Sequence, residues 1–111
     1  MRHVIQGVPF FKEETTAKIC DTPFTSHCYT DGTIEFKGTA TSFSAEIQAC
    51  IDKNTTENWV TLCVVDESNF NTLTNITAKG LYSFNAMGKT IRVEIKSISG
   101  GNLTVTGKFV D

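Results

Sequence analysis

The chain has 111 residues, of which 40% are hydrophobic and 20% charged, and its ten basic and twelve acidic residues give a net charge of −2. A chain of this length forms one domain, which can bury enough surface to fold without a metal ion or a disulfide. Because the charges are scattered, there is no basic stripe for nucleic acid and no polybasic patch for lipid, and neither nucleic acid nor a membrane is an expected partner.

The N-terminal residues lack the apolar run of a secretory signal, and no window in the chain approaches the length of a transmembrane span. We therefore expect the protein to be made and used from the cytoplasm. Residues 1–32 are the least periodic part of the chain, and the first twenty of them contain no clear strand pattern before residue 15. We interpret residues 1–20 as an extended N-terminal arm that precedes a β-sandwich domain of residues 21–111.

The arm carries apolar side chains that allow two interpretations. Large aromatic side chains are seldom exposed without a reason, so they belong either to the core or to a contact surface. If the arm lies on a neighbouring subunit, the residues that form this interface are Val4, Ile5, Val8, Phe10 and Phe11. Residues 15–20 could add a first edge strand, and Asp31-Gly32 is a strong turn signal before the next element.

Residues 33–37 alternate between polar and apolar side chains and end at a glycine, which predicts a short strand. Residues 39–52 are ambiguous. Their apolar positions fit the period of a strand, but a helix capped by Ser42 would also place four of them on one face, namely Phe43, Ile47, Cys50 and Ile51. We predict the strand, because the surrounding segments have the turn-punctuated spacing of a β-sandwich or barrel.

Residues 59–65 form the most hydrophobic segment of the chain, which predicts a strand buried on both faces. Trp59, at its start, is expected to anchor the core at one end of the sandwich. Residues 66–79 are a long polar connection, in which we expect Phe70, Leu73 and Ile76 to be tucked inward. Residues 73–77 could form a further strand.

The C-terminal third of the chain has the clearest strand pattern. Residues 81–86, 91–96 and 103–110 each alternate between apolar and polar side chains, which predicts three half-buried strands. Short glycine-containing turns separate them, so we expect a three-stranded meander whose last two strands form a hairpin. The whole chain is therefore expected to be all-β, an antiparallel sandwich of seven or eight strands of jelly-roll or immunoglobulin-like type.

The four cysteines show no metal or redox spacing, since no C-x-x-C occurs. Free thiols that behave as small apolar side chains are the default interpretation in a cytoplasmically made protein. The alternatives are a disulfide between Cys20 and Cys28, a metal site that adds His27 to that pair, and a disulfide between Cys50 and Cys63.

No arrangement of residues indicates catalysis. The two histidines lack a nucleophile partner, no serine lies in a G-x-S-x-G elbow, and no glycine loop has phosphate-binding form. Residues 52–54 begin like a calcium loop, but the required glycine and final glutamate are missing. We therefore predict no catalytic residues, no metal and no cofactor. Trp59, Tyr82, Phe43 and Phe84 could line a sugar platform, although their inward phase favours the core.

The C-terminal two thirds has a recognisable order of motifs. It reads F-K-G-T-A-T-S-F-S-A-E-I-Q at 36–48, then Asn58-Trp59, Ile76-Thr77, Gly80-Leu81-Tyr82, Ile91-Arg92-Val93 and G-G-N-L-T-V at 100–105. Over residues 34–110 this order resembles small β-sandwich virion proteins of tailed bacteriophages. The resemblance implies that Trp59 and Tyr82 plug the core and that Gly80 and Gly100-Gly101 make turns. The chain departs from the pattern before the tryptophan, where Thr56-Glu57-Asn58 replaces the usual D-G.

The resemblance also implies a function. Such proteins are head-decoration, connector or tail components, so we expect a non-catalytic virion subunit that works through protein–protein interfaces. Its expected partners are capsid or tail subunits and further copies of itself, in a homo-oligomer such as a trimer. It would assemble in the cytoplasm of the host bacterium and end in the virion. The alternative is a carbohydrate-binding or host-adhesion module, with Trp59, Tyr82 and residues 66–79 as its contact surface.

Overall fold

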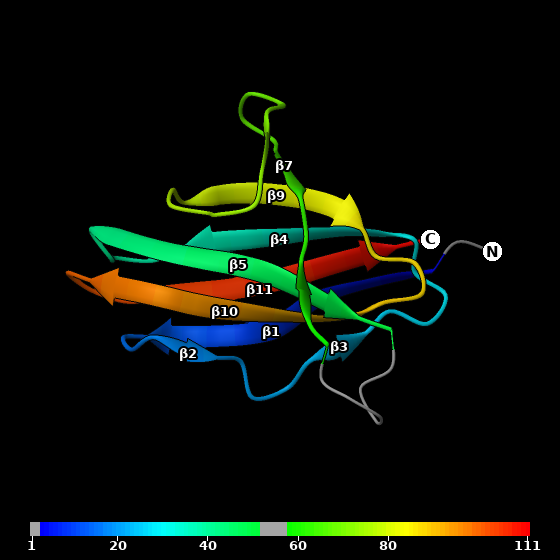
Figure 1. The fold of residues 1–111 in the computed structure, drawn as a ribbon, viewed down its shortest axis with the longest axis horizontal. Helices are drawn as coiled ribbons and strands as arrows, with labels where there is room; N and C mark the ends of the chain where they lie inside the picture. Colours follow the sequence, from blue (N-terminus) through cyan, green and yellow to red (C-terminus); the bar gives the residue numbers. More distant parts are fainter. Residues whose placement is uncertain (1–2, 52–57) are drawn as a thin grey trace.

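The computed structural model describes residues 3–51 and 58–111. All regular secondary structure within these residues is β-strand (Figure 1). The strands are β1 (Val4–Glu14), β2 (Lys18–Ile19), β3 (Phe24–Thr25), β4 (Asp31–Lys37), β5 (Ser42–Cys50), β6 (Val60–Thr61), β7 (Val64–Asp66), β8 (Thr72–Leu73), β9 (Gly80–Asn85), β10 (Thr90–Ser99) and β11 (Leu103–Val110). They pair only in antiparallel fashion and form two stacked sheets. The predicted all-β antiparallel sandwich is confirmed.

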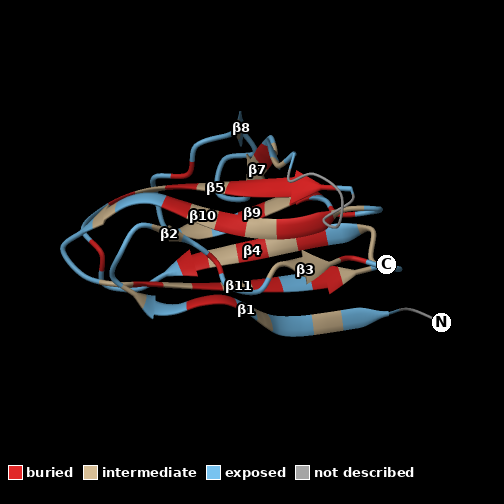
Figure 2. Cartoon of the chain, turned by 60° about the horizontal axis from the view of Figure 1, so that its bottom comes forward, coloured by how far each residue is buried: buried red, intermediate tan, exposed pale blue. Residues whose placement is uncertain are grey.

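The first sheet has six strands in the order β1-β11-β4-β9-β7-β8, and the second has the order β2-β10-β5-β6, with β3 paired to β10. The core lies between them, where the inward residues of each alternating strand meet (Figure 2). Phe36 of β4 stacks on Phe43 of β5 with ring centroids 5.9 Å apart, and Tyr82 of β9 meets Phe36 edge-on at 5.7 Å. Such rings bury large areas and prefer these offset geometries.

The three C-terminal strands are present, but the predicted meander is wrong. β9 and β11 both pair with β4 in the first sheet, whereas β10 pairs with β5 in the second. The turn at residues 99–102 therefore carries the chain across the sandwich and does not close a hairpin. A period of two shows which side chains of a strand are buried. It does not show whether the next strand along the chain pairs with it in the same sheet or lies in the opposite sheet.

Residues 42–50 form β5, so the strand prediction is confirmed over the helix. The strand pairs with β10 from Ser42↔Ser99 to Cys50↔Thr90, and Ala45 and Ile47 are fully buried. Residues 38–41 link β4 to β5 and cross between the sheets like the turn at 99–102. Two crossing turns thus lie together at one end of the sandwich, and hydrogen bonds from Ala40 N to Asn102 O and from Thr41 N to Ser99 O, both 3.0 Å, join them.

The segment that begins at Trp59 is not one central strand. β6 pairs with β5 in the second sheet, β7 pairs with β9 in the first, and Leu62 and Cys63 lie between them, so this segment changes sheets. Val60 is 64% exposed, whereas Val64 is 1% exposed. The prediction of burial on both faces is therefore wrong, because an apolar run at a sheet edge can bury its two halves against different sheets.

The N-terminal arm of residues 1–20 is not confirmed as a separate extended segment. β1 is hydrogen-bonded to β11 from Val4↔Val110 to Glu14↔Leu103 and forms the edge of the first sheet. The register shifts three times along this pair, and Gly7 has a φ of +71°. Bulges of this kind twist an edge strand and limit its pairing with other chains. Residues 18–19, within the predicted edge strand at 15–20, form β2.

The sandwich measures 41 × 32 × 23 Å along its principal axes. At the end opposite the crossing turns, Phe109 stacks on Phe24 with ring centroids 4.2 Å apart and meets Phe84 edge-on. Gly32 is packed so closely that a Cβ there would lie 2.7 Å from the Phe109 ring and 2.8 Å from the Phe84 ring. Within its described ranges the structure contains no helix of the length and apolarity needed to cross a membrane.

Candidate functional site

The five residues predicted to form an interface all lie on β1, but their environments differ. Phe10 and Phe11 are 6% and 5% exposed and belong to the core of their own sandwich. Ile5 and Val8 are half-buried against that core, and Val4 is 49% exposed. Because the two phenylalanines are already packed, the side chains that remain available to a neighbour are the three aliphatic ones. The contact with a neighbouring subunit stays a prediction.

The four cysteines are free thiols in separate environments. Cys20 and Cys50 are buried, whereas Cys28 and Cys63 are exposed. Cys20 Sγ accepts a hydrogen bond from the backbone N–H of Val93 at 3.4 Å, and burial raises the pKa of this thiol. Cys20 therefore stays protonated near neutral pH and acts as a packed side chain of the second sheet.

Trp59 is not the core anchor that its position in the sequence predicts. It is half-buried outside the core cluster, and the guanidinium of Arg92 lies 4.2 Å from the centre of its ring. Tyr82, by contrast, is 1% exposed and fills the core. The alternative of a sugar platform made of Trp59, Tyr82, Phe43 and Phe84 is therefore not formed. Tyr82, Phe43 and Phe84 are buried, as their inward phase predicts, and Trp59 has a cation over its face.

The polar side chains beside Trp59 bind one another on the outer face of the second sheet. Arg92 Nε donates to Gln48 Oε1 at 2.7 Å, and Gln48 Nε2 donates to Glu46 Oε1 at 3.0 Å and to Glu94 Oε1 at 2.9 Å. The hydrogen bonds from Gln48 and Thr61 hold the pKa of Glu46 below its ordinary value. Glu46 is thus a stable carboxylate near neutral pH, which suits a structural network better than proton transfer.

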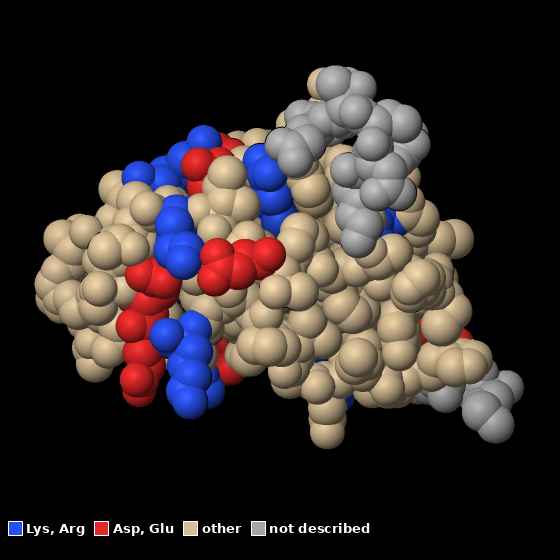
Figure 3. Space-filling model, turned by 90° about the horizontal axis from the view of Figure 1, so that it is seen from below, with Lys and Arg blue, Asp and Glu red and all other residues tan. Residues whose placement is uncertain are grey.

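Charged side chains elsewhere are also interleaved. On the face shown in Figure 3, lysine and arginine side chains alternate with aspartate and glutamate and do not gather into a patch of one sign. Lys96, for example, lies 3.2 Å from Glu94, and Lys18 lies 3.8 Å from Glu14. Exposed pairs of this kind contribute little to stability. This face of the molecule therefore carries charges of both signs side by side.

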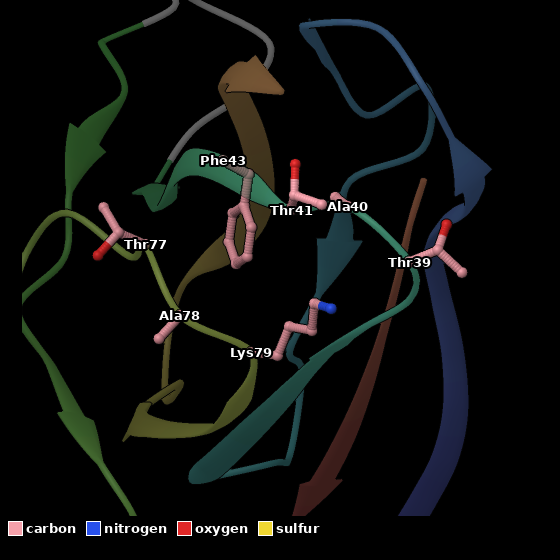
Figure 4. A pocket seen from close by; sticks show the side chains of 7 residues that line it. All are labelled: Thr39, Ala40, Thr41, Phe43, Thr77, Ala78 and Lys79. Atoms are coloured by element: carbon pink, nitrogen blue, oxygen red, sulfur yellow. The ribbon is translucent and has the colours of Figure 1, made fainter. Parts of the chain in front are cut away.

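A pocket of about 370 Å³ opens at the end of the sandwich where the two crossing turns lie. Figure 4 shows the ring of Phe43 pointing into the space between residues 39–41 on one side and residues 77–79 on the other. The lining residues are Thr39, Ala40, Thr41, Phe43, Thr77, Ala78 and Lys79. Phe43 and Ala40 are only 6% and 2% exposed, because they belong to the core. The exposed lining therefore consists mainly of threonine hydroxyl groups, the Ala78 methyl group and the Lys79 ammonium group.

The first wall of the pocket is fixed by the packing of the two crossing turns. Thr41 lies so near the second turn that a Cβ on Gly100 would be 1.9 Å from Thr41 Oγ1, and Gly100 has a φ of +77°. Asn102 N also donates to Thr39 Oγ1 at 3.1 Å. A glycine is required at position 100 both for the backbone conformation and for this close approach.

The second wall is held by hydrogen bonds to the sandwich. Ala45 and Ile76 exchange backbone hydrogen bonds of 2.9 and 2.8 Å, and Ser44 Oγ donates to Asn75 Oδ1 at 2.6 Å. Tyr82 Oη donates to the Ala78 carbonyl at 2.5 Å. Burial raises the pKa of Tyr82, so this phenol remains a donor across the physiological range. Both walls are therefore formed before any ligand arrives.

Phe70 lies in the connection between β7 and β8, and the expectation that it is tucked inward is wrong. Its side chain is 76% exposed, and its φ of +61° is unusual for a bulky residue. Leu73 is half-buried and Ile76 is fully buried, so the other two residues of that expectation are confirmed. No pattern in the sequence indicates that Phe70 is exposed, because its polar neighbours are equally typical of a loop that folds back onto the core.

The sequence itself places the chain in a family. A profile of the family called XepA matches residues 8–109. The chain belongs to the XepA family. No protein of curated function matches the sequence.

Two solved structures share the fold of this XepA-family chain. The structure described as "SPBc2 prophage-derived protein YomS" has a TM-score of 0.88 and 18% identity, over 100% of this chain and 96% of that one. The structure described as "PBSX exported protein XepA" has a TM-score of 0.89 and 21% identity, over 99% of this chain. The chain spans only 38% of that XepA protein. At these identities the two structures establish a shared fold.

The XepA-family match includes both walls of the pocket and the Phe70 connection, whereas Val4 and Ile5 lie outside it. The resemblance seen in the sequence was to β-sandwich proteins of tailed phages. The family and the two structural relatives support its phage origin. Neither description refers to a phage head or tail, so the head-decoration or tail type stays a prediction.

Proposed function

We propose that the chain is a phage-encoded, non-catalytic structural subunit that works by binding other proteins through its surface. The observation that carries the proposal is the XepA-family match over residues 8–109, together with the prophage-derived relative that is almost wholly one such sandwich. The same unit covers 38% of a longer relative. A unit that occurs both alone and within a longer chain suits a module that contributes binding surface to an assembly.

The arrangement of polar groups supports a role without catalysis. Glu46, Gln48 and Arg92 are bound to one another on the outer sheet face, and hydrogen bonds keep the pKa of Glu46 low. A general acid or base near neutral pH needs a pKa shifted towards 7, and this carboxylate is shifted in the opposite direction. Such a network stiffens the sheet and presents a fixed surface.

We infer that the subunit acts in the virion, as a capsid decoration or a head or tail accessory protein, after assembly in the host cytoplasm. Its partners are capsid or tail subunits and further copies of itself, in a homo-oligomer such as a trimer. The description of one relative as an exported protein agrees with a place of action outside the cytoplasm. The exposed aliphatic residues of β1, Val4 among them, offer one contact surface.

The test is to follow the protein through the purification of phage particles. Particles are separated on a density gradient from a lysate of the producing strain, and the protein is detected in each fraction with an antibody. Banding with particles supports a virion subunit. Protein that remains wholly in the particle-free fractions, with particles of unchanged composition from a deletion strain, would refute it.

The structure also determines which variant tests the β1 surface. Deleting residues 1–11 would remove Phe10 and Phe11 from the core and unfold the protein, so a loss of incorporation would be ambiguous. Val4→Asp instead changes an exposed side chain. We expect this variant to remain folded and to be lost from particles, and Leu81→Asp, which alters an exposed residue of β9, is the matched control.

A further inference from the structure

The turn between β7 and β8 projects from the sandwich and carries one large apolar side chain. Residues 67–71 are all exposed, and Figure 1 shows this turn at the top of the molecule beyond β7. Phe70 is 76% exposed there, so its ring gains little from burial in its own chain. Single exposed apolar side chains are common on protein surfaces, so exposure alone does not mark a binding residue.

The backbone conformation of Phe70 is what distinguishes it. Its φ of +61° lies in the left-handed region, which bulky residues adopt only at a cost in free energy. Asparagine fits this region better, and it stands at positions 69 and 71, yet the left-handed position itself carries a phenylalanine. Residues held in such conformations cluster at binding sites, where a function other than stability retains them.

Hydrogen bonds within the turn fix the direction in which the ring points. Phe70 N donates to Asp66 O at 2.7 Å, and Asp66 N donates to Asn71 O at 2.9 Å. Asp66 Oδ1 also accepts from Ser68 N at 2.9 Å, and Asn69 Oδ1 accepts from Asn71 N at 2.9 Å. A ring presented by a fixed turn loses little conformational entropy when a partner binds it.

Two carboxylates at the base of the turn indicate the charge of the surface that would meet the ring. Within residues 3–51 and 58–111, no lysine, arginine or histidine lies within ion-pair distance of Asp66 or Glu67. Their side chains accept hydrogen bonds only from neutral groups there, namely the N–H and hydroxyl of Ser68 and the hydroxyl of Ser83. A partner with lysine or arginine around an apolar pocket would complement both the ring and these charges.

The composition of the turn favours a protein over a lipid surface as that partner. Residues 67–71 offer one apolar side chain among carboxylate, amide and hydroxyl groups. Segments that bind at a membrane surface combine several apolar side chains with basic ones, and anionic headgroups would repel Asp66 and Glu67. A single ring on a projecting turn instead matches a concave apolar pocket of the kind that proteins form.

The turn also lies apart from the other contact surface of the subunit. In the first sheet, β1 is at one edge, and β7 and β8 are at the opposite edge. The exposed aliphatic side chains of β1 and the Phe70 turn are therefore two separate surfaces, and the second is available to a different protein.

We propose that Phe70 anchors an interface with a protein other than a copy of this chain, whose apolar pocket takes the ring and whose lysine or arginine side chains face Asp66 and Glu67. This inference rests on the proposed role in protein binding and names a surface and the chemistry of its partner. An aromatic anchor on a fixed turn, with charged groups around it, has the anatomy of an energetic hot spot.

The first test places a photo-crosslinking residue at the position of the ring. Phe70→p-benzoylphenylalanine keeps an aromatic side chain, and the full chain that carries it is made in the phage-producing strain and irradiated. We expect an adduct with a different protein, which mass spectrometry maps to an apolar pocket bordered by lysine or arginine. Met87→p-benzoylphenylalanine is the matched control, since Met87 is 56% exposed in the turn between β9 and β10 and should not give this adduct.

The other outcomes of this experiment overturn the proposal. They are the absence of an adduct at position 70, adducts only with further copies of the chain, with lipid or with polysaccharide, and a protein adduct on a surface without basic residues. An adduct of equal yield from position 87 would also count against Phe70 as the anchor.

The second test measures the affinity of the purified chain for the protein that the adduct identifies. We expect Phe70→Ala to raise the dissociation constant at least about tenfold. Glu67→Lys should also weaken binding, whereas Asp21→Lys, which makes the same change of charge at a side chain that is 86% exposed between β2 and β3, should not. Unchanged affinity of Phe70→Ala would overturn the proposal, and equal effects of the two charge reversals would refute the basic rim.

The third test separates binding from folding. Phe70→Asn suits the left-handed conformation, so we expect a melting temperature equal to or above that of the unmodified chain, together with weaker binding. A lower melting temperature would show that the ring stabilises its own chain and would overturn its role as an exposed anchor. The particle-fractionation experiment uses the unmodified chain, so particles that contain the protein without any adduct at position 70 would refute this inference alone and leave the proposed function standing.

Discussion

Tyr82 offers the sharpest test of how the pocket is built. Its ring is 1% exposed and meets Phe36 edge-on, while its hydroxyl donates to the Ala78 carbonyl at 2.5 Å. Tyr82→Phe keeps the ring and removes the donor. A typical intramolecular hydrogen bond contributes about 0.5–1.5 kcal/mol net, and water can reach the exposed Ala78 once the hydroxyl is gone. We therefore expect the free energy of unfolding to fall by about 1 kcal/mol.

The assay is urea denaturation of both proteins, read as a change in midpoint at constant slope. A loss of this size corresponds to a decrease of roughly 4–6 °C in melting temperature for a domain of this length. Tyr82→Ala also removes the ring and should cost about 3–5 kcal/mol. The control is Tyr29→Phe, because the Tyr29 hydroxyl has no hydrogen-bond partner in the described part of the chain and its removal should be neutral. A Tyr82→Phe protein as stable as the unmodified chain would refute the proposal that this bond holds the pocket wall.

Three further predictions follow from particular contacts. Gly32→Ala should destabilise the fold by about 1–3 kcal/mol, since its Cβ would lie 2.7 Å from the Phe109 ring; an unchanged denaturation midpoint would show that the aromatic cluster can move. Because hydrogen bonds lower the pKa of folded Glu46, the stability that its carboxylate provides is present above pH 4.5, the ordinary pKa, and is lost as the pH falls through the folded pKa. Glu46→Gln should therefore show a shallower loss of stability in acid, though Glu14, whose pKa is also lowered, keeps part of the slope; equal slopes for the two proteins would contradict this. Arg92→Ala should increase acrylamide quenching of the single tryptophan, Trp59, because the guanidinium covers its ring at 4.2 Å, and unchanged quenching would argue against that contact in solution.

Much of the local structure could be predicted from the sequence because side-chain alternation reports burial directly. The inward residues of β10, Ile91, Val93 and Ile95, are at most 1% exposed, as their period of two indicates. The same reasoning decided correctly between strand and helix for β5. Alternation failed where both faces of a segment are apolar, as at residues 59–65, since an apolar run carries no information about which sheet covers each half.

The candidate site could not be predicted from the sequence, because its two walls come from distant parts of the chain. The two walls of the pocket lie more than thirty positions apart in the chain, at residues 39–41 and 77–79, and they meet because Ala45 and Ile76 pair across the edge of the second sheet. The sequence indicates that the motif of Ile76, Gly80 and Tyr82 supports the fold. The hydrogen bond from the Tyr82 hydroxyl to the Ala78 carbonyl, however, depends on the position of that hydroxyl in the folded chain. No local pattern specifies such a contact.

The sequence by itself determined that the chain is an antiparallel β-sandwich and which side chains of most strands face inward, because the period of a strand is a local property of its residues. Only the tertiary structure decided that β10 lies in a different sheet from β9 and β11, that Phe10 and Phe11 belong to the core, and that Phe70 is exposed. These outcomes depend on which distant segments become neighbours. That choice is made by the packing of the whole domain, in which strands far apart in the chain compete for the same faces and edges.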